Sequence, residues 1–279
     1  MNHPAELAIN QYLEDATSGK STMSEETVQQ IGNDVMDAMR RQFGGGKGRD
    51  EFRLRMSNIG KPTCQLWFAK NKPEEALPKP TTFVMNMLLG DIVEAAFKGI
   101  IKEAGYPYED KDNFVTLQLG DAMIKGSYDI VVDGAMDDVK SASDWSYRNK
   151  FESYDTLQKS DPFGYVGQLA GYAKASGKKV GGWWVVNKAN GNIKYVPADG
   201  LDLDEQLAKL EKTVEIVNEN KFERCFAPVP ETFRGVPSGN TVLNDSCKFC
   251  DFRFSCFDIE ELPSKVSKAK TLPIVAYVK

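Results

Sequence analysis

The stretch over residues 126–141, GSYDIVVDGAMDDVKS, constrains the fold more than any other part of this chain. It contains two apolar-rich runs, 127–132 and 135–139, which are separated by Asp133 and Gly134. Because both residues of an Asp-Gly pair tolerate a positive φ, this pattern predicts a β-hairpin with a two-residue turn.

The predicted hairpin brings three ionisable side chains together. Asp129 lies on the first strand, and Asp138 and Lys140 lie two residues apart on the second. Side chains alternate along a strand, so Asp138 and Lys140 share one face of the sheet. Two carboxylates and an ammonium at one point are costly in a protein core. The same groups are well suited to holding a divalent cation and activating a water molecule beside it.

Apolar periodicity and turn residues predict the remaining elements. These are helices capped at Thr22 and Asp202, helices over 81–105 and 161–176, and strands over 113–119, 123–132, 135–141, 180–187 and 192–196. This order predicts an α/β fold in which a mixed central β-sheet is flanked by helices.

A glycine-rich linker over 44–50 suggests how the chain is divided. We expect an N-terminal helical extension over 1–50, a core domain over 51–260 and a C-terminal tail over 261–279. No apolar run is long enough to predict a transmembrane helix, and no signal peptide is recognised, so we expect a cytoplasmic protein with few disulfides.

Composition excludes several classes of function. The formal charge of −5 argues against a protein that coats nucleic acid by bulk charge, although a basic groove can be local. The only histidine is His3, close to the N-terminus. Serine–histidine and cysteine–histidine catalysis and histidine-ligated zinc sites all need an ordered histidine, so the chemistry is expected to use carboxylates, lysine, tyrosine, cysteine and a bound metal.

Three cysteines form a tight group near the C-terminus. Cys247, Cys250 and Cys256 make a C-x2-C-x5-C pattern. In an intracellular protein such spacing indicates a metal or cluster site rather than disulfides. A fourth ligand would have to be Cys64 or Cys225, and a four-thiolate site can hold either zinc or an iron–sulfur cluster.

Other candidate residues are less specific. Glu94 has apolar neighbours in the sequence, which suits either a metal ligand or the exposed edge of a helix. Gln168 and Tyr172 are four residues apart and share a helix face. Aromatic and basic residues alternate after the predicted hairpin, which suits stacking on bases and contact with phosphates, although an ordinary surface loop has a similar composition. These residues are Trp145, Tyr147, Arg148 and Lys150.

In their order along the chain, these motifs resemble the RecB-like branch of the PD-(D/E)xK nucleases. The resemblance rests on Asp129, Asp138-Val-Lys140, Gln168-x3-Tyr172 and the split cysteine set, and it covers roughly residues 53–260. It is strongest to the iron–sulfur exonucleases of this branch, which include the CRISPR-associated RecB-like exonucleases and the AddB nuclease domain.

The resemblance implies a restriction-endonuclease-like core with a cysteine-ligated layer that joins the N- and C-terminal segments. Magnesium or manganese would be held by carboxylates and a backbone carbonyl, with Lys140 beside the metal, while Gln168 and Tyr172 would position active-site groups or DNA. The implied metal ligands are Glu94, Asp129, Asp138 and Val139, and the implied 4Fe–4S ligands are Cys64, Cys247, Cys250 and Cys256.

Two positions depart from the family pattern. Glu94 follows Gly90 where the family often has a histidine, and Gln65 follows Cys64 where an arginine or lysine is usual. A carboxylate is also a hard metal ligand, so Glu94 suits the role. The resemblance gives no account of residues 1–50.

The expected function is that of a magnesium- or manganese-dependent DNA exonuclease. It would act on single-stranded DNA or DNA ends in recombination, repair or replication, in a bacterial or phage-infected cell, alone or beside a helicase or recombinase. One alternative is a non-catalytic DNA-end-binding or scaffolding subunit of a helicase–nuclease or recombination complex. Another is a structural protein stapled by zinc.

Overall fold

The central sheet forms around the predicted hairpin. In the computed structural model, which describes residues 3–44 and 51–279, Ile130–Val132 (β4) pairs antiparallel with Ala135–Ala142 (β5). Asp133 and Gly134 make the turn with φ angles of 52° and 74°. The hairpin and its turn residues are therefore confirmed.

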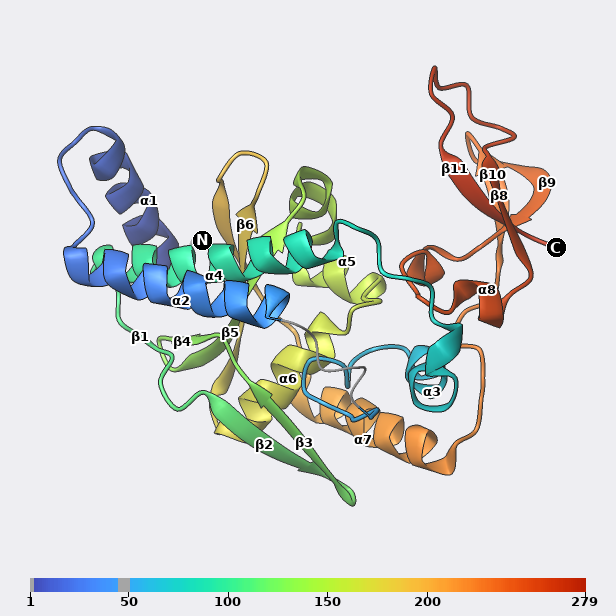
Figure 1. Ribbon diagram of the computed structural model, residues 1–279, viewed down its shortest axis with the longest axis horizontal. Helices are drawn as coiled ribbons and strands as arrows, with labels where there is room; N and C mark the ends of the chain where they lie inside the picture. The colour runs from blue at the N-terminus through green and yellow to red at the C-terminus, as the bar shows by residue number, and fades with distance from the viewer. Residues whose placement is uncertain (1–2, 45–50) are drawn as a thin grey trace.

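The fold is mixed α/β, as predicted, with a mixed sheet flanked by helices (Figure 1). Its five strands have the order β1-β4-β5-β6-β7, and only β5 and β6 run parallel. The outer strands and β6 are Tyr108–Glu109 (β1), Lys179–Asn187 (β6) and Ile193–Pro197 (β7).

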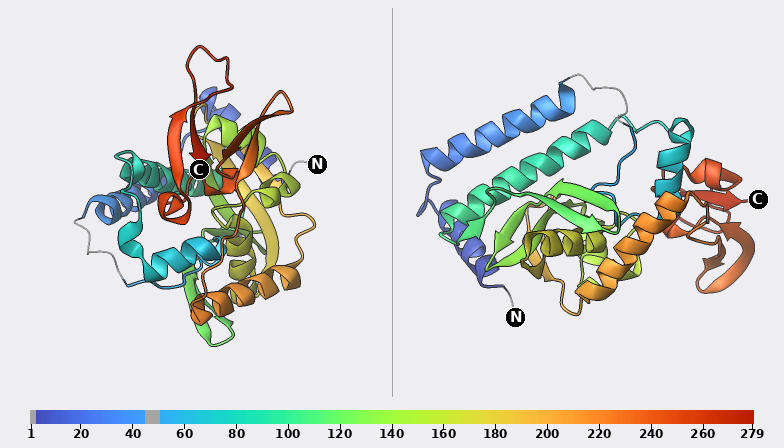
Figure 2. Two further views of the ribbon diagram at one scale, coloured as in Figure 1. Left: turned by 90° about the vertical axis from the view of Figure 1, so that its right-hand side faces the viewer. Right: turned by 90° about the horizontal axis from the view of Figure 1, so that it is seen from below.

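Helices cover both faces of this sheet. Tyr165–Ser176 (α6) packs on one face, and Pro4–Thr17 (α1) and Phe83–Glu103 (α4) pack on the other. Leu203–Glu219 (α7) packs against α6. Glu25–Phe43 (α2) lies alongside α4 (Figure 2). The helices of the N-terminal extension therefore take part in the packing of the core.

Two hydrophobic clusters follow from this layering. On the α6 face the core includes Met136, Leu169 and Trp183, and on the α4 face it includes Val139 and Trp184. Neighbouring residues of β5 and β6 thus belong to opposite cores, as the alternation of a strand requires. The same alternation directs Asp138 and Lys140 toward α6.

The sequence predicts one strand over 123–132, but the structure divides it. Ala122–Ser127 (β3) pairs with Phe114–Leu119 (β2) as a separate two-stranded ribbon, and the chain enters the central sheet only at β4. Asn113 fixes the crossing, because its carbonyl accepts from Tyr128 N at 3.1 Å and its Nδ2 donates to Tyr128 O at 2.7 Å.

Helix α2 also begins later than the predicted capping box. Its N-cap is Ser24, whose Oγ accepts from Thr27 N at 3.3 Å, rather than Thr22. The reason is a tertiary contact, because Glu103 of α4 accepts both from Ser24 N at 3.0 Å and from Ser24 Oγ at 2.6 Å. The predicted cap at Asp202 is confirmed, with Oδ1 accepting from Glu205 N at 3.0 Å.

His3 has a defined place at the start of α1. Its Nδ1 accepts from Ala5 N at 3.1 Å, and its ring packs against Trp184 and Tyr195. These contacts are those of a helix cap and a packed aromatic ring on the α4 face of the sheet, away from Asp138 and Lys140.

The C-terminal part forms a second sheet beyond a small helical region (Figure 1). Its strand order is β10-β11-β9-β8, so the predicted boundary at 260/261 lies within β10. The strands are Val229–Phe233 (β8), Val236–Val242 (β9), Ile259–Pro263 (β10) and Ile274–Val278 (β11). The short helices are Thr63–Asn71 (α3), Pro73–Glu75 (η1), Ser146–Lys150 (η2), Tyr154–Lys159 (α5), Asp245–Cys247 (η3) and Arg253–Cys256 (α8).

Most of the predicted linker, residues 45–50, lies outside the described residues. Across 3–44 and 51–279, none of the helices combines the length and the apolar character that crossing a membrane would need.

Candidate active site

Asp129 immediately precedes β4, at the end of the hairpin away from the turn. Ile130 is the first paired residue of β4 and lies opposite Asp137, so Asp129 faces Asp138 just beyond the ladder. Its Oδ2 accepts a hydrogen bond from Val139 N at 2.9 Å. The carboxylate therefore replaces the strand partner that β5 lacks at this point, and it is fixed next to Asp138 and Val139.

Asp138 and Lys140 form an ion pair on the α6 face. Lys140 Nζ lies 2.5 Å from Asp138 Oδ2, and the two side chains are 18% and 4% exposed. This oxygen makes no hydrogen bond of normal geometry within the described residues. Lys140 Nζ also lies 5.0 Å from the centroid of the Tyr165 ring. The site thus holds a buried carboxylate whose charge is met by one ammonium.

The charges of the two carboxylates, Asp129 and Asp138, are mutually unfavourable. Burial raises the pKa of Asp129, and the charge of Asp138 raises it further. Burial likewise raises the pKa of Asp138, with Lys140 opposing the change. For Lys140, burial lowers the pKa, but the charges of Asp138 and Asp129 outweigh this effect and leave the pKa above its ordinary value. Lys140 is therefore an ammonium at neutral pH.

Glu94 approaches the site from α4. Burial raises its pKa first and the charge of Asp129 raises it second, while Lys98 and Lys140 act in the opposite direction. Lys98, one helical turn later, holds Glu94 Oε1 at 2.7 Å from its Nζ. The side chain of Glu94 is 33% exposed, and its role as a metal ligand stays a prediction.

Gln168 and Tyr172 lie on α6. Tyr172 is buried and hydrogen-bonded to Gln168, and burial raises its pKa to about 12. Its hydroxyl is close enough to Asp129, Asp138 and Lys140 for their charges to act on it. A Cβ at Gly126 would lie 2.9 Å from Tyr172 Oη, so the glycine lets β3 pass directly beside this hydroxyl.

The four predicted DNA contacts divide into two pairs. Trp145 is 68% exposed, and Arg148 is exposed with its Nε donating to Asp144 Oδ1 at 3.1 Å. Trp145 is the N-cap of the π-helix η2 and Arg148 lies within it, a local geometry that often accompanies functional sites. Both side chains lie on the surface beside the end of β5.

Tyr147 and Lys150 point inward instead. The ring of Tyr147 packs against the core beneath Lys194. Lys150 Nζ lies 4.6 Å from the ring centroids of Phe163 and Tyr165 and 4.0 Å from Asp161. Lys150 thus supplies a second cation beside the ring of Tyr165, which Lys140 also contacts.

Tyr165 and Asp161 also lie at the site, although the sequence pattern indicated for Asp161 only a place at the start of the helix over 161–176 and for Tyr165 no role. Tyr165, Gln168 and Tyr172 have the spacing of one helix face, a pattern from which Tyr165 could have been found. Asp161 caps α6, accepting from Gly164 N at 3.1 Å and from Val166 N at 2.9 Å. Its charge also acts on Asp138, so the cap belongs to the electrostatics of the site.

Asp137, the residue before Asp138, faces the opposite core. It accepts from Gly182 N at 2.7 Å, Tyr195 Oη at 2.9 Å and Trp184 Nε1 at 3.0 Å. The register of β5 and β6 shifts at this point, between Met136 and Asp138. The carboxylate of Asp137 fills the resulting irregularity, a common way of fixing strands next to a functional site.

The donor chemistry fits a hard divalent cation. Carboxylate oxygens are the ligands that Mg²⁺ and Mn²⁺ prefer. Here Asp129, Asp138 and Glu94 come together, with the ammonium of Lys140 on Asp138 and that of Lys98 on Glu94. Across residues 3–44 and 51–279, however, no three His, Cys, Asp or Glu side chains are arranged so that they could hold a metal as they stand. Full coordination would require these carboxylates to move closer together.

The cysteines lie at the junction of α3 and the C-terminal segment. Cys247, Cys250 and Cys256 belong to a third hydrophobic cluster, in which Phe68 of α3 stacks on Phe252 at 5.3 Å. Burial raises the pKa of all three thiols, that of Cys247 to about 12. Two segments far apart in sequence therefore meet here.

Cys225, the alternative fourth ligand, lies against Cys64. Cys64 N donates to Cys225 Sγ at 3.1 Å, and Thr63 Oγ1 lies 3.3 Å from the same sulfur. The hydrogen bond from the Cys64 thiol, supported by those from Thr63, lowers the pKa of Cys225 to about 6. The charges of Cys225 also act on Cys247 and Cys256. Within residues 3–44 and 51–279, the cysteines are not arranged as a group that could hold a metal or a cluster as they stand, so the predicted ligand set stays a prediction.

Comparison with known proteins adds little. No family model matches the chain, and no curated protein does. The solved structure of SSO0001 is similar with a TM-score of 0.44 and 13% sequence identity, over 80% of this chain and 93% of that chain.

Proposed function

We propose that this protein is a magnesium- or manganese-dependent nuclease that hydrolyses phosphodiester bonds of DNA. The observation that carries the proposal is the grouping of Asp129, Asp138 and Lys140 around the β4–β5 hairpin, with Oδ2 of Asp129 on Val139 N and Lys140 on Asp138. Buried like charges are retained where they do chemistry, because they destabilise a fold that does not use them.

The metal would be held by the carboxylates of Asp129, Asp138 and Glu94 and by the carbonyl oxygen of Val139. When bound, Mg²⁺ or Mn²⁺ lowers the pKa of a coordinated water and neutralises charge on the phosphate. The chain's own contribution is to hold these oxygens in a half-buried position where their charge is poorly screened.

Lys140 would act as a fixed positive charge. Its raised pKa means that it remains protonated, so it can donate hydrogen bonds to a phosphate oxygen or to the attacking water. Tyr165 and Asp138 restrict the position of the ammonium. Lys150, whose ammonium also lies over the ring of Tyr165, would add positive charge for the phosphate of a neighbouring nucleotide.

Gln168 and Tyr172 would position the substrate or the active-site groups. Tyr172 cannot serve as a base near neutral pH, since burial raises its pKa to about 12. It can donate a hydrogen bond, and Gln168 orients it.

We further propose that the chain belongs to the RecB-like PD-(D/E)xK nucleases with an iron–sulfur cluster and that it is an exonuclease in the cytoplasm of a bacterial or phage-infected cell. Cys64, Cys247, Cys250 and Cys256 would hold a 4Fe–4S cluster with a structural role, since hydrolysis needs no electron. Such a cluster would close a chain segment of almost two hundred residues between α3 and α8, and closing so long a loop stabilises the fold.

The test is digestion of single- and double-stranded DNA labelled at the 5′ or the 3′ end, in Mg²⁺, Mn²⁺ or EDTA. We expect metal-dependent release of label, with Lys140→Ala and Asp138→Asn each slower by several orders of magnitude, as expected when electrostatic stabilisation of the transition state is lost. Lys188→Ala, at an exposed lysine outside the site, is the matched control.

Two outcomes would count against the proposal. A Lys140→Ala protein that cleaves at the wild-type rate would remove the assigned role of Lys140. Folded wild-type protein that binds DNA ends but cleaves no substrate in either metal would favour the non-catalytic subunit instead.

A further inference from the structure

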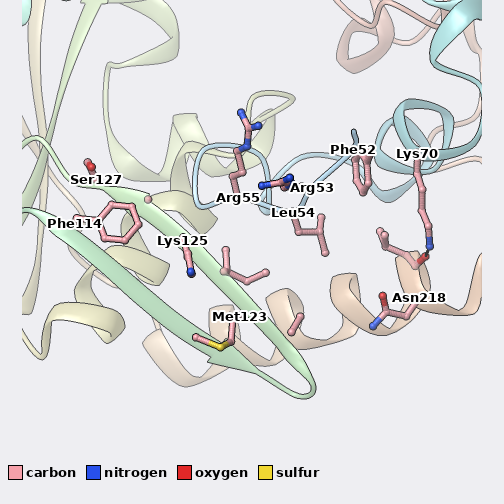
Figure 3. Close-up of a pocket in the computed structure, with 14 residues that line it drawn as sticks. Phe52, Arg53, Leu54, Arg55, Lys70, Phe114, Met123, Lys125, Ser127 and Asn218 are labelled. Atoms are coloured by element: carbon pink, nitrogen blue, oxygen red, sulfur yellow. Dashed lines mark hydrogen bonds between the residues drawn. The ribbon is translucent and has the colours of Figure 1, made fainter. Parts of the chain in front are cut away.

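An open groove lies between residues 52–55 and the β2–β3 ribbon, with the end of α7 as its third wall (Figure 3). It encloses about 790 Å³, which makes it a large hollow on this protein. Figure 3 shows Lys125 and Met123 on the ribbon side, Arg53 and Leu54 on the opposite side, and Lys70 beside Asn218 at the far end.

The charge of this groove is opposite to that of the chain. Four cations line it, Arg53, Arg55, Lys70 and Lys125, and none of the described residues that line it is acidic. The whole chain carries a net charge of −5. The hollow on the other side of residues 53–55 also contains Glu51, Glu74 and Asp251, so the purely positive stretch is confined to the groove. A polyanion is the ligand that this distribution attracts.

The groove also exposes large apolar side chains. Phe114 is 63% exposed and Met123 is 59% exposed, and the half-buried Phe52 lines the opposite wall. Exposed aromatic rings among cations suit a single strand, because its unpaired bases can stack on them. Duplex DNA buries its base faces and would leave these rings in water.

The groove leads toward the candidate active site. Strand β3 forms its floor from Ala122 to Ser127, a length of roughly 20 Å. Ser127 is two residues from Asp129, so their Cα atoms are at most about 7 Å apart. Phe114 is the cross-strand partner of Ser127, which puts this ring at the end of the groove that is nearer to Asp129.

We propose that this groove binds single-stranded DNA and guides it to Asp129, with Arg53 and Lys125 contacting phosphates and Phe114 stacking on the base nearest the site. This inference rests on the proposed nuclease function for its direction, but binding in the groove can be measured without cleavage. It predicts that the enzyme selects single strands over duplexes by stacking rather than by sequence.

The experiment is fluorescence anisotropy with a labelled 15-nucleotide strand of mixed sequence and with its blunt duplex, in EDTA so that nothing is cleaved. We expect the single strand to bind at least about tenfold more tightly than the duplex. The Arg53→Glu/Lys125→Glu variant should lose about tenfold or more in affinity, and the slope of log affinity against log salt should flatten by about 1.4, at about 0.7 for each lost phosphate contact.

Matched controls separate the groove from overall charge. Lys20→Glu/Lys179→Glu changes the net charge equally at two exposed lysines outside the groove and should bind as the wild type does. Phe114→Ala should lose about fivefold or more for the single strand, the lower limit for one stacked base. Phe43→Ala, at an exposed phenylalanine of α2, should lose nothing.

The outcomes distinguish this inference from the proposed function. Equal affinity for single strand and duplex, or wild-type affinity in the Arg53→Glu/Lys125→Glu and Phe114→Ala variants, would overturn the groove assignment even if the protein cleaves DNA. Groove-dependent binding by a protein that fails to cleave in Mg²⁺ or Mn²⁺ would retain the groove and reject the nuclease.

Discussion

Replacing Asp129 by asparagine should stabilise this protein while removing its proposed activity. Burial and the charge of Asp138 raise the pKa of Asp129 from 3.8 to about 6. A difference of about two pH units between the folded and unfolded pKa corresponds to roughly 3 kcal/mol. Asparagine resembles the protonated carboxyl and can still accept the hydrogen bond from Val139 N. We therefore expect Asp129→Asn to raise the free energy of unfolding by up to about 3 kcal/mol at pH 8.

The pH dependence follows from the sign of this pKa difference. A carboxyl whose folded pKa is raised contributes its full stability below the unfolded pKa of 3.8, and that stability is lost as the pH rises through about 6. The advantage of the asparagine variant should accordingly be complete at pH 8, fall to roughly half at pH 5 and be small at pH 4.

The assay is urea unfolding of the wild type and of Asp129→Asn at these three pH values in EDTA, followed by tryptophan fluorescence. Asn113→Asp is the control. It makes the reverse change, from amide to carboxylate, at a neighbouring side chain that donates to Tyr128 O, and it should lower the free energy of unfolding at pH 8. Adding Mg²⁺ should stabilise the wild type more than the variant, because binding to the folded state alone raises its stability. A variant that is less stable than the wild type at pH 8, or a difference that does not change between pH 4 and pH 8, would refute the reasoning.

Three further changes test other parts of the structure. Gly181→Ala should lower the free energy of urea unfolding by about 1–3 kcal/mol, because the new Cβ would lie 2.0 Å from Asp137 Oδ1. Gly32→Ala, in the open middle of α2, should raise it by about 0.5–1 kcal/mol. Similar values for the two variants would contradict the close packing of Asp137. Glu94→Gln should raise the Mg²⁺ concentration for half-maximal cleavage by about tenfold or more, and an unchanged metal titration would exclude Glu94 as a ligand. Cys64→Ser should lose bound iron and brown colour while Cys225→Ser keeps both, as iron analysis and absorbance will show; the reverse result would make Cys225 the fourth ligand.

The elements that could be predicted from the sequence are those fixed by neighbouring residues. The Asp133-Gly134 turn requires two positive φ angles, and an Asp-Gly pair supplies them wherever it stands. The cap of α7 at Asp202 is equally local. The period-2 alternation of β5 then follows from the hairpin, and it is sufficient to predict that Asp138 and Lys140 share a face.

The elements that could not be predicted depend on distant partners. The strand expected over 123–132 bends at Tyr128 because Asn113 binds its backbone from both sides. Nothing in the apolar pattern distinguishes a strand that continues from one that crosses to another sheet. Likewise Ser24 replaces Thr22 as the cap of α2 only because Glu103, 79 residues away, accepts its hydrogen bonds.

Asp137 and Asp138 show most clearly why one half of a site can be read from sequence and the other half cannot. They are chemically identical neighbours, yet alternation sends Asp138 to Lys140 on the α6 face and Asp137 into the opposite core, where three donors hold it. Those donors lie on β6 and β7, more than forty residues further along the chain.

The consequence reaches the proposed active site, because Asp137 fills the irregularity that sets β5 against β6. The absence of a side chain at Gly181 leaves room for Asp137 Oδ1, and Gly182 N donates to the same oxygen. A shift of one residue in this pairing would exchange the two faces of β5 and turn Lys140 away from α6. Asp137 therefore helps to determine where the proposed catalytic residues point, although it faces away from them.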